Sequence, residues 1–235
     1  MIDDILRKKN AHVDKIIADF QKEFKALSGD VQTEVLKLFR QGRFDRAGFV
    51  AAFDGYEQLA DDFLARNAEL IKYTKEIATE LGVKFALTEE GLKAYDLLQD
   101  IIFDRLKNLN AQYIDDMRLF GLRSQLEGAS RQKMMGGLQE MFDSMGRNLN
   151  AEINTATGYM DSVVKKDFYE QAGIEKYKYF GPLDAKTRDE CRDTLSDPRQ
   201  QTGWTMAEIE SSATPFIERG GWNCRHEWIA FVGDE

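Results

Sequence analysis

The sequence has 235 residues, 43% of them hydrophobic and 31% charged, which is typical of a soluble chain able to bury its own core. Its net charge of −9 argues against a protein that coats duplex DNA, although direct DNA contact through a local basic patch stays open. No apolar run approaches the roughly 20 residues that span a bilayer, and MIDDILRKKN has no apolar signal segment. We therefore expect no membrane partner and a cytoplasm-like compartment.

The chain changes composition near Gly173. All three prolines, all three tryptophans and both cysteines lie beyond residue 181. Because proline is the strongest helix breaker, its absence before that point permits long helices. We predict two domains, a helical arm or bundle over residues 1–172 and a small α+β domain over residues 173–235.

Apolar residues of the N-terminal region recur at three- and four-residue steps, the spacing of one buried helix face. The first such stripe is expected to break at Ser28-Gly29-Asp30, where Asp30 can cap a second, short helix over residues 31–39. A third helix is predicted over residues 45–81, with Gly82 at its C-terminal cap.

Two longer helices are predicted next. Thr88, followed by two glutamates, is a good N-cap for a helix whose apolar stripe reaches Phe120. Ser130 can cap another helix that runs to about Ala172 and is weakened at Gly136-Gly137. Such lengths far exceed the usual mean of about 11 to 12 residues and favour an extended bundle or a coiled-coil arm. A simple antiparallel bundle is the alternative.

Short elements replace the long helices after Gly173. Residues 177–180 are aromatic and are stopped by Gly-Pro, which predicts a strand. Residues 205–210 predict a short helix, and residues 228–232 predict a second strand that ends at Gly233. The expected fold class is therefore mainly α, with long N-terminal helices followed by a small α+β domain.

Several groups of residues follow one another in a definite order. A helix rich in Asn and Glu (residues 150–154) precedes a glycine with an aromatic strand (173–177). An Asp-x-x-Thr-Arg-x-x-Cys stretch follows (184–191), and an Asn-Cys-Arg-His stretch (223–226) precedes the last strand. Over roughly residues 148–232 this ordered set resembles the phage head morphogenesis proteins related to protein F of phage Mu, also called minor head proteins.

The chain departs from that family pattern at two points. It has Gly220-Gly221-Trp222 where the family often has an upstream His or a Pro-Pro pair. It also has Arg188 where some members have another Cys near the first one. The number of metal ligands that the resemblance implies is therefore open.

The resemblance implies a non-enzymatic structural component of a tailed bacteriophage head. Such a minor capsid or head morphogenesis protein would associate with the portal or the inner head shell. Its implied partners are the phage portal protein and the major capsid protein, and long helices also suggest self-association. The implied location is the virion, with the host cytoplasm during assembly. The alternative is a metal-dependent nuclease or a transferase-like enzyme that uses the C-terminal Cys/His cluster.

Cys191, Cys224 and His226 are residue types that bind zinc, and Asp184 or Asp189 is the candidate fourth ligand. A structural zinc ion would help a domain of about 60 residues that has little core of its own. Two alternatives stay open. In the first, the two cysteines are free and half-buried beside an exposed His226, in plain packing or a polar network. In the second, the cysteines form a disulfide in a released virion.

Polar residues beside these ligands predict a structural network rather than catalysis. Asp184 and Arg188 are four residues apart and can pair if the segment is helical. Arg188 or Arg225 can instead hold carboxylates that orient the two strands. The full predicted network is Thr187, Arg188, Asn223 and Arg225.

No catalytic residue is predicted. The sequence has two histidines, His12 and His226, and no oxyanion loop accompanies the pair of Cys191 and His226. A contact surface for portal or capsid protein is predicted instead, because three tryptophans are more than a small domain needs for packing. The interface candidates are Trp204, Trp222 and Trp228.

Overall fold

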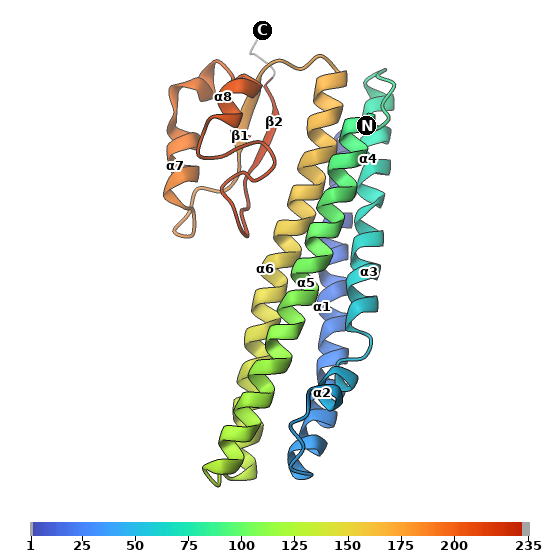
Figure 1. The fold of residues 1–235 in the computed structure, drawn as a ribbon. Helices are drawn as coiled ribbons and strands as arrows, with labels where there is room; N and C mark the ends of the chain where they lie inside the picture. Colours follow the sequence, from blue (N-terminus) through green and yellow to red (C-terminus); the bar gives the residue numbers. More distant parts are fainter. Residues whose placement is uncertain (1, 232–235) are drawn as a thin grey trace. The chain divides into compact units, whose positions relative to one another are not determined.

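A computed structural model describes residues 2–231, with side chains from residue 7 onward. Long helices precede a small region with a two-stranded sheet, which confirms the predicted fold class (Figure 1). None of the described helices is both long and apolar enough to span a membrane. The N-terminal helices are α1 (Ile2–Arg40), α2 (Arg46–Ala52), α3 (Tyr56–Asn67), α4 (Glu69–Glu80), α5 (Glu89–Leu126) and α6 (Arg131–Gln171), of which α1, α5 and α6 are long. The short C-terminal elements are β1 (Tyr177–Phe180), α7 (Asp189–Ser196), the 3-10 helix η1 (Pro198–Gln201), α8 (Met206–Glu210) and β2 (Glu227–Ala230).

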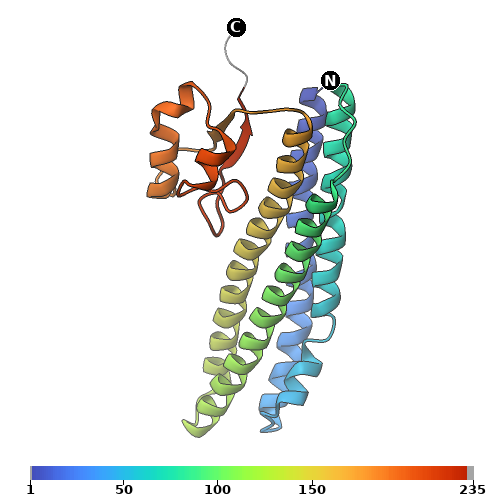
Figure 2. The same cartoon turned by 45° about the horizontal axis from the view of Figure 1, so that its top comes forward.

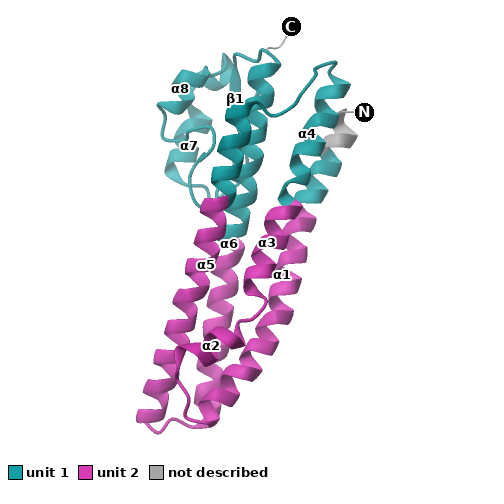
Figure 3. Ribbon diagram, turned by 45° about the vertical axis from the view of Figure 1, so that its right-hand side comes forward, with its two compact units in different colours: residues 1–13, 67–99, 151–235 teal, residues 14–66, 100–150 magenta. Residues whose placement is uncertain are grey.

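The chain divides into two compact units, and α1, α5 and α6 contribute residues to both (Figure 3). Unit 2 comprises residues 14–66 and 100–150. Unit 1 comprises the chain up to residue 13, residues 67–99 and the chain from residue 151 onward. The predicted domain boundary between residues 172 and 173 falls inside unit 1 and stays a prediction.

Helix α1 runs straight through Ser28-Gly29-Asp30, so the predicted break there and the separate helix over residues 31–39 are wrong. Ser28 Oγ donates to the Phe24 carbonyl at 2.7 Å, so this hydroxyl binds a helical carbonyl of the preceding turn. Val31 and Val35 are both buried. Burial of one continuous apolar face outweighs the roughly 1 kcal/mol that an internal glycine costs a helix.

The single helix predicted over residues 45–81 is also wrong, because the structure has α2, α3 and α4 in its place. Asp45 caps α2 by accepting from the Gly48 amide at 2.8 Å. Gly55, with a φ of 90°, turns the chain between α2 and α3. Such a backbone angle favours glycine and ends a helix. Gly82 has a φ of 71° just after α4, at the C-terminal cap that the sequence predicted.

Helices α5 and α6 begin where the sequence predicted. The Gly91 amide donates to Thr88 Oγ1 at 3.0 Å, and the Lys133 amide donates to Ser130 Oγ at 3.2 Å. Within unit 2 the two helices lie side by side in opposite directions, joined by a short turn (Figures 1 and 2). The predicted weak point at Gly136-Gly137 does not interrupt α6.

Gly137 marks a close approach of α6 to α5. A Cβ atom there would overlap the ring of Phe120, whereas a Cβ at Gly136 would meet nothing within 4 Å. We expect Gly137→Ala to destabilise the chain by about 1–3 kcal/mol, because the ring must move. Gly136→Ala is the matched control, and better helix propensity should stabilise it by about 0.5–1 kcal/mol. Urea unfolding measures both, and equal effects of the two substitutions would contradict this packing.

The small sheet pairs β1 and β2 antiparallel, with Tyr177 opposite Ala230 and Phe180 opposite Glu227. Strand β1 has the predicted bounds, and β2 begins one residue before the predicted strand. The predicted end of that strand, at Val232 and Gly233, lies outside the described residues. The predicted short helix is α8, which Thr205 opens with a capping box.

The core of this small α+β region is mainly aromatic. Trp204 and Trp228 are only 2% and 1% exposed, and Trp228 Nε1 donates to the Thr214 carbonyl at 2.8 Å. The predicted interface role is therefore wrong for these two tryptophans. A region this small has few large apolar side chains, and they fill its interior. The buried core comprises Tyr177, Tyr179, Cys191, Trp204, Ile209, Phe216 and Trp228.

A buried charge cluster lies elsewhere in unit 1. Asp161 on α6 forms ion pairs with Lys9 of α1 and, at 2.8 Å, with Lys165 one turn further along α6. Lys165 also pairs with Glu227 of β2. Burial alone would raise the pKa of Asp161, but the charges of Lys165 and Lys9 outweigh burial and hold the pKa below its usual range. The cluster thus joins the first helix, the last long helix and the last strand.

Candidate metal centre

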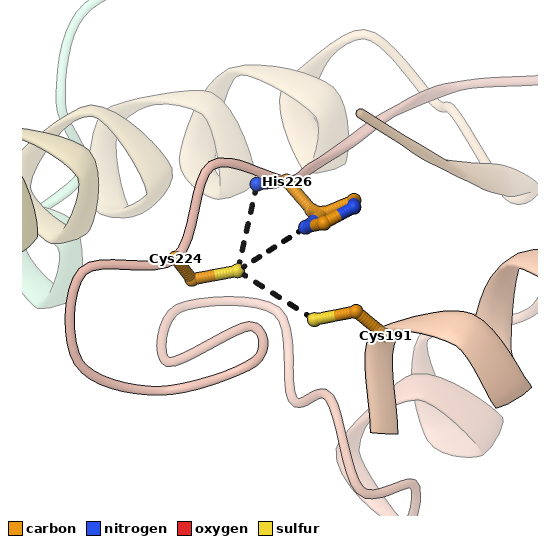
Figure 4. A group of neighbouring side chains, drawn as sticks. All are labelled: Cys191, Cys224 and His226. Carbon is orange, nitrogen blue, oxygen red and sulfur yellow. Dashed lines mark hydrogen bonds between the residues drawn. The ribbon is translucent and has the colours of Figure 1, made fainter. Parts of the chain in front are cut away.

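Cys191, Cys224 and His226 meet in the small α+β region, as the sequence predicted (Figure 4). Cys191 lies in the first turn of α7, while Cys224 and His226 lie just before β2. The three possible ligand atoms are all within 4.8 Å of one another. Cys191 and His226 are buried, and Cys224 is half-buried. These residues could together hold a metal ion.

Two of the separations between donor atoms match the edges of a tetrahedron around one ion, and both include Cys224 Sγ. The two Sγ atoms are 3.8 Å apart, and Cys224 Sγ is 3.6 Å from His226 Nδ1. Zinc bonds of about 2.3 Å to sulfur and about 2.0–2.1 Å to nitrogen give tetrahedral edges of about 3.8 and 3.6 Å. A disulfide needs sulfurs about 2.0 Å apart. Both cysteines are free, so the disulfide alternative is not what the structure has.

The His226 ring is oriented as a metal ligand requires. Its Nε2 lies 2.9 Å from the Pro182 carbonyl. A carbonyl only accepts, so Nε2 carries the hydrogen and Nδ1 presents its lone pair toward Cys224. Metal-binding histidines almost always donate their other ring N–H in this way. Burial lowers the pKa of His226, which favours the neutral ring that binds metals.

The two thiols have different surroundings. Burial would raise the pKa of Cys224, but hydrogen bonds from the His226 amide, Tyr179 and the Gly220 amide outweigh burial and lower it. Burial raises the pKa of Cys191. Gly220 lies so close to both sulfurs that a Cβ atom there would overlap Cys191 Sγ. The backbone at residue 220 therefore closes one side of the group.

Asp184, one of the two predicted candidates for the fourth ligand, does not belong to the group of Cys191, Cys224 and His226. Its two carboxylate oxygens accept from the guanidinium of Arg225 at 2.7 and 2.8 Å. This pair holds the pKa of Asp184 well below its usual range. The other candidate, Asp189, is exposed in the first turn of α7 and is not in the group either. The fourth position thus needs another donor.

The helical pairing of Asp184 with Arg188 is wrong, because α7 begins only at Asp189. Arg188 instead donates to the carbonyls of Gly220 and Trp222, which holds the loop before Cys224. Arg225 does hold a carboxylate, that of Asp184. The predicted role of such a pair in orienting the two strands stays a prediction.

The remaining members of the predicted polar network also contact this loop or its neighbours. Thr187 Oγ1 donates to the Pro182 carbonyl at 2.9 Å, the same carbonyl that binds His226. The Asn223 amide donates to Thr155 Oγ1 at 2.7 Å. Asn223 has a φ of 56°, a strained angle for a non-glycine residue that these contacts maintain.

Helix α6 holds the same loop through side chains of its Asn- and Glu-containing stretch. Asn154 Nδ2 lies 3.4 Å from Asn223 Oδ1. Trp222 Nε1 donates to Glu152 at 2.9 Å, while the Trp222 side chain is 47% exposed. Trp222 is therefore the one predicted interface tryptophan that stays a candidate.

Tyr179 is a member of the site that the sequence analysis missed. Its hydroxyl lies 3.5 Å from Cys191 Sγ and 3.6 Å from Cys224 Sγ. Its ring is nearly parallel to that of His226, at 14° with centroids 5.3 Å apart. Burial raises the pKa of Tyr179, and hydrogen bonds to the two cysteines raise it further. Alternation along β1 places Tyr177 and Tyr179 on one buried face, which was the available signal.

Fold and site together define a mainly helical protein whose small α+β region contains a largely buried Cys, Cys and His group. The chain matches no family model, no curated protein and no solved structure. Its function is therefore inferred from the order of its motifs and from the chemistry of this group.

Proposed function

We propose that this chain is a structural minor head protein of a tailed bacteriophage, and that zinc holds its small α+β region together. One observation carries the proposal. The stretches that resemble phage Mu protein F-like proteins are far apart in sequence, yet side chains from three of them meet at the loop before Cys224. Arg188 and the Asn154–Asn223 pair hold the loop that carries Cys224.

Zinc is the metal that suits these donors best. Two thiolates and an imidazole select zinc among the common divalent ions of the cell. The 3.8 Å and 3.6 Å donor separations support a tetrahedral ion of that size. Burial of Cys191 and His226 favours a structural ion, since a catalytic zinc keeps a position open to substrate. When bound, the ion would supply a cross-link between α7 and the segment before β2.

The proposed partners are the portal protein, the major capsid protein and further copies of the chain. Trp222 is the side chain we propose for such a contact, because it is large, 47% exposed and fixed through its indole N–H. The proposed location is the virion, after assembly in the host cytoplasm.

The proposed role as a head protein is tested with phage particles that are assembled in the presence of a substituted chain. We expect His226→Ala to remove the chain from purified particles or to leave defective heads, because the small region loses a ligand. His12→Ala is the control, since the other histidine lies on α1 and pairs with Glu69. Mass spectrometry and electron microscopy of the particles give the readout.

Two results would oppose the proposal. One is particles of normal shape that never contain the chain. The other is a purified monomer with nuclease or transferase turnover that His226→Ala abolishes, which would establish the enzyme alternative instead.

A further inference from the structure

The three predicted ligands leave one corner of a tetrahedron without a donor. Structural zinc sites are almost always four-coordinate. Both acidic candidates from the sequence lie outside the group, and the Asp184 carboxylate is held by Arg225. The fourth donor must therefore come from another residue or from solvent.

Tyr179 Oη lies where such a donor would be. It is 3.5 Å from Cys191 Sγ and 3.6 Å from Cys224 Sγ. A tetrahedral ion bound to sulfur at about 2.3 Å and to oxygen at about 2.0–2.2 Å has S–O edges of about 3.6 Å. Together with the S–S and S–N separations, four edges of one tetrahedron have the lengths that zinc requires.

The surroundings of Tyr179 favour its own hydroxyl over a water molecule. The Tyr179 side chain is only 1% exposed, and stacking on His226 fixes its ring. Gly220 covers the sulfur atoms so closely that even a methyl group does not fit there. A solvent ligand would have to displace the tyrosine hydroxyl from its place between the two sulfurs.

We propose that Tyr179 Oη is the fourth ligand, which makes the site a Cys191, Cys224, His226 and Tyr179 centre. This inference rests on the structural zinc ion proposed above to join α7 and the segment before β2, which we call the zinc clip. It assigns Tyr179 a direct bond to the ion, and not only a hydrogen bond to sulfur. Strand β1 thereby joins α7 and the segment before β2 at one ion.

Cobalt substitution of the full chain tests the assignment, because the visible spectrum of Co²⁺ reports its ligands. The native chain, Tyr179→Phe and the control Tyr177→Phe are each loaded with Co²⁺ and titrated with azide. Tyr177 is an equally buried tyrosine of the same strand, but its hydroxyl donates to the Ile174 carbonyl at 2.7 Å. The control thus loses a core hydroxyl that lies outside the site.

We expect the native chain and Tyr177→Phe to give one spectrum that azide does not change. Tyr179→Phe should give a different spectrum that shifts with azide, because an exchangeable ligand now fills the corner. Its zinc affinity should fall by at least the roughly 10- to 100-fold typical of losing an outer-shell partner. X-ray absorption of the native zinc form should show two sulfur and two nitrogen or oxygen donors, which reports a four-coordinate ion. The azide titration of the native chain then separates Tyr179 from a solvent ligand, a readout that holds even if a variant does not fold.

The results that overturn the inference differ from those that overturn the clip. A native spectrum that shifts with azide, or a Tyr179→Phe spectrum identical to the native one, refutes Tyr179 as a ligand while the clip stands. A native chain that binds neither Co²⁺ nor Zn²⁺ refutes both.

Discussion

Removal of zinc is expected to destabilise the small α+β region by about 4 kcal/mol when free zinc had been near 1,000 times its dissociation constant. The physical reason is that the proposed ion would bind the folded arrangement of Cys191, Cys224 and His226 and not the dispersed ligands of the unfolded chain. Thermal unfolding in the presence of zinc and of EDTA measures the difference. Tryptophan fluorescence is the appropriate probe, because all three tryptophans lie in this region.

The control for metal removal is Cys224→Ser, which keeps the shape of the side chain but loses a thiolate ligand. This variant should unfold at the same temperature with zinc and with EDTA, near that of the native chain in EDTA. Coincident transitions of the native chain in the two conditions would mean that no stabilising ion binds.

The second large effect is expected from Asp161→Asn, which removes one of the two anions of the largely buried charge cluster. Among the side chains that the structure describes, the substitution leaves the ammonium group of Lys9, 3% exposed, without a carboxylate in contact, and Lys165 with Glu227 alone. Breaking a buried ion pair at one partner typically costs about 3–5 kcal/mol. Urea unfolding at neutral pH measures the loss.

The pH dependence of this effect has a definite sign. The lysines hold the pKa of Asp161 below its unfolded value of about 3.9, so the carboxylate stabilises the fold at higher pH. That contribution is lost as the pH falls through the folded pKa, and the native chain should approach the variant only below about pH 4. Asp19→Asn is the control, because Asp19 pairs with Lys15 on the surface and should change little. A small effect of Asp161→Asn at neutral pH would contradict the role of the cluster.

Local chemistry predicted the ends of many elements correctly. Thr88, Ser130 and Gly82 act within one turn of their own position, and the structure has each of them at the predicted cap. The continuity of α1 was mispredicted for the opposite reason. Val31 and Val35 are buried by packing against other segments of the chain, and this burial keeps the helix continuous. The local sequence around Gly29 gives no information about that packing.

The candidate site, like the fold, was predictable from the sequence only in part. Cysteine and histidine are so sparse in this chain that Cys191, Cys224 and His226 stood out as ligands. Asp184 was wrongly chosen because its true partner, Arg225, lies 41 residues away and takes both carboxylate oxygens. Tyr179 was missed because an aromatic residue in a strand is ordinarily core, and only folding brings its hydroxyl between the two sulfurs.

The discontinuous makeup of unit 1 has a consequence for synthesis on the ribosome. Unit 2 contains no residue beyond 150, whereas unit 1 combines the start of the chain and residues 67–99 with residues 151 onward. The ammonium group of Lys9 therefore stays exposed to water until its partner Asp161, about 150 residues later in the chain, has been translated. We expect a nascent chain to complete unit 2 first and to fold the opening turns of α1 into unit 1 only afterwards.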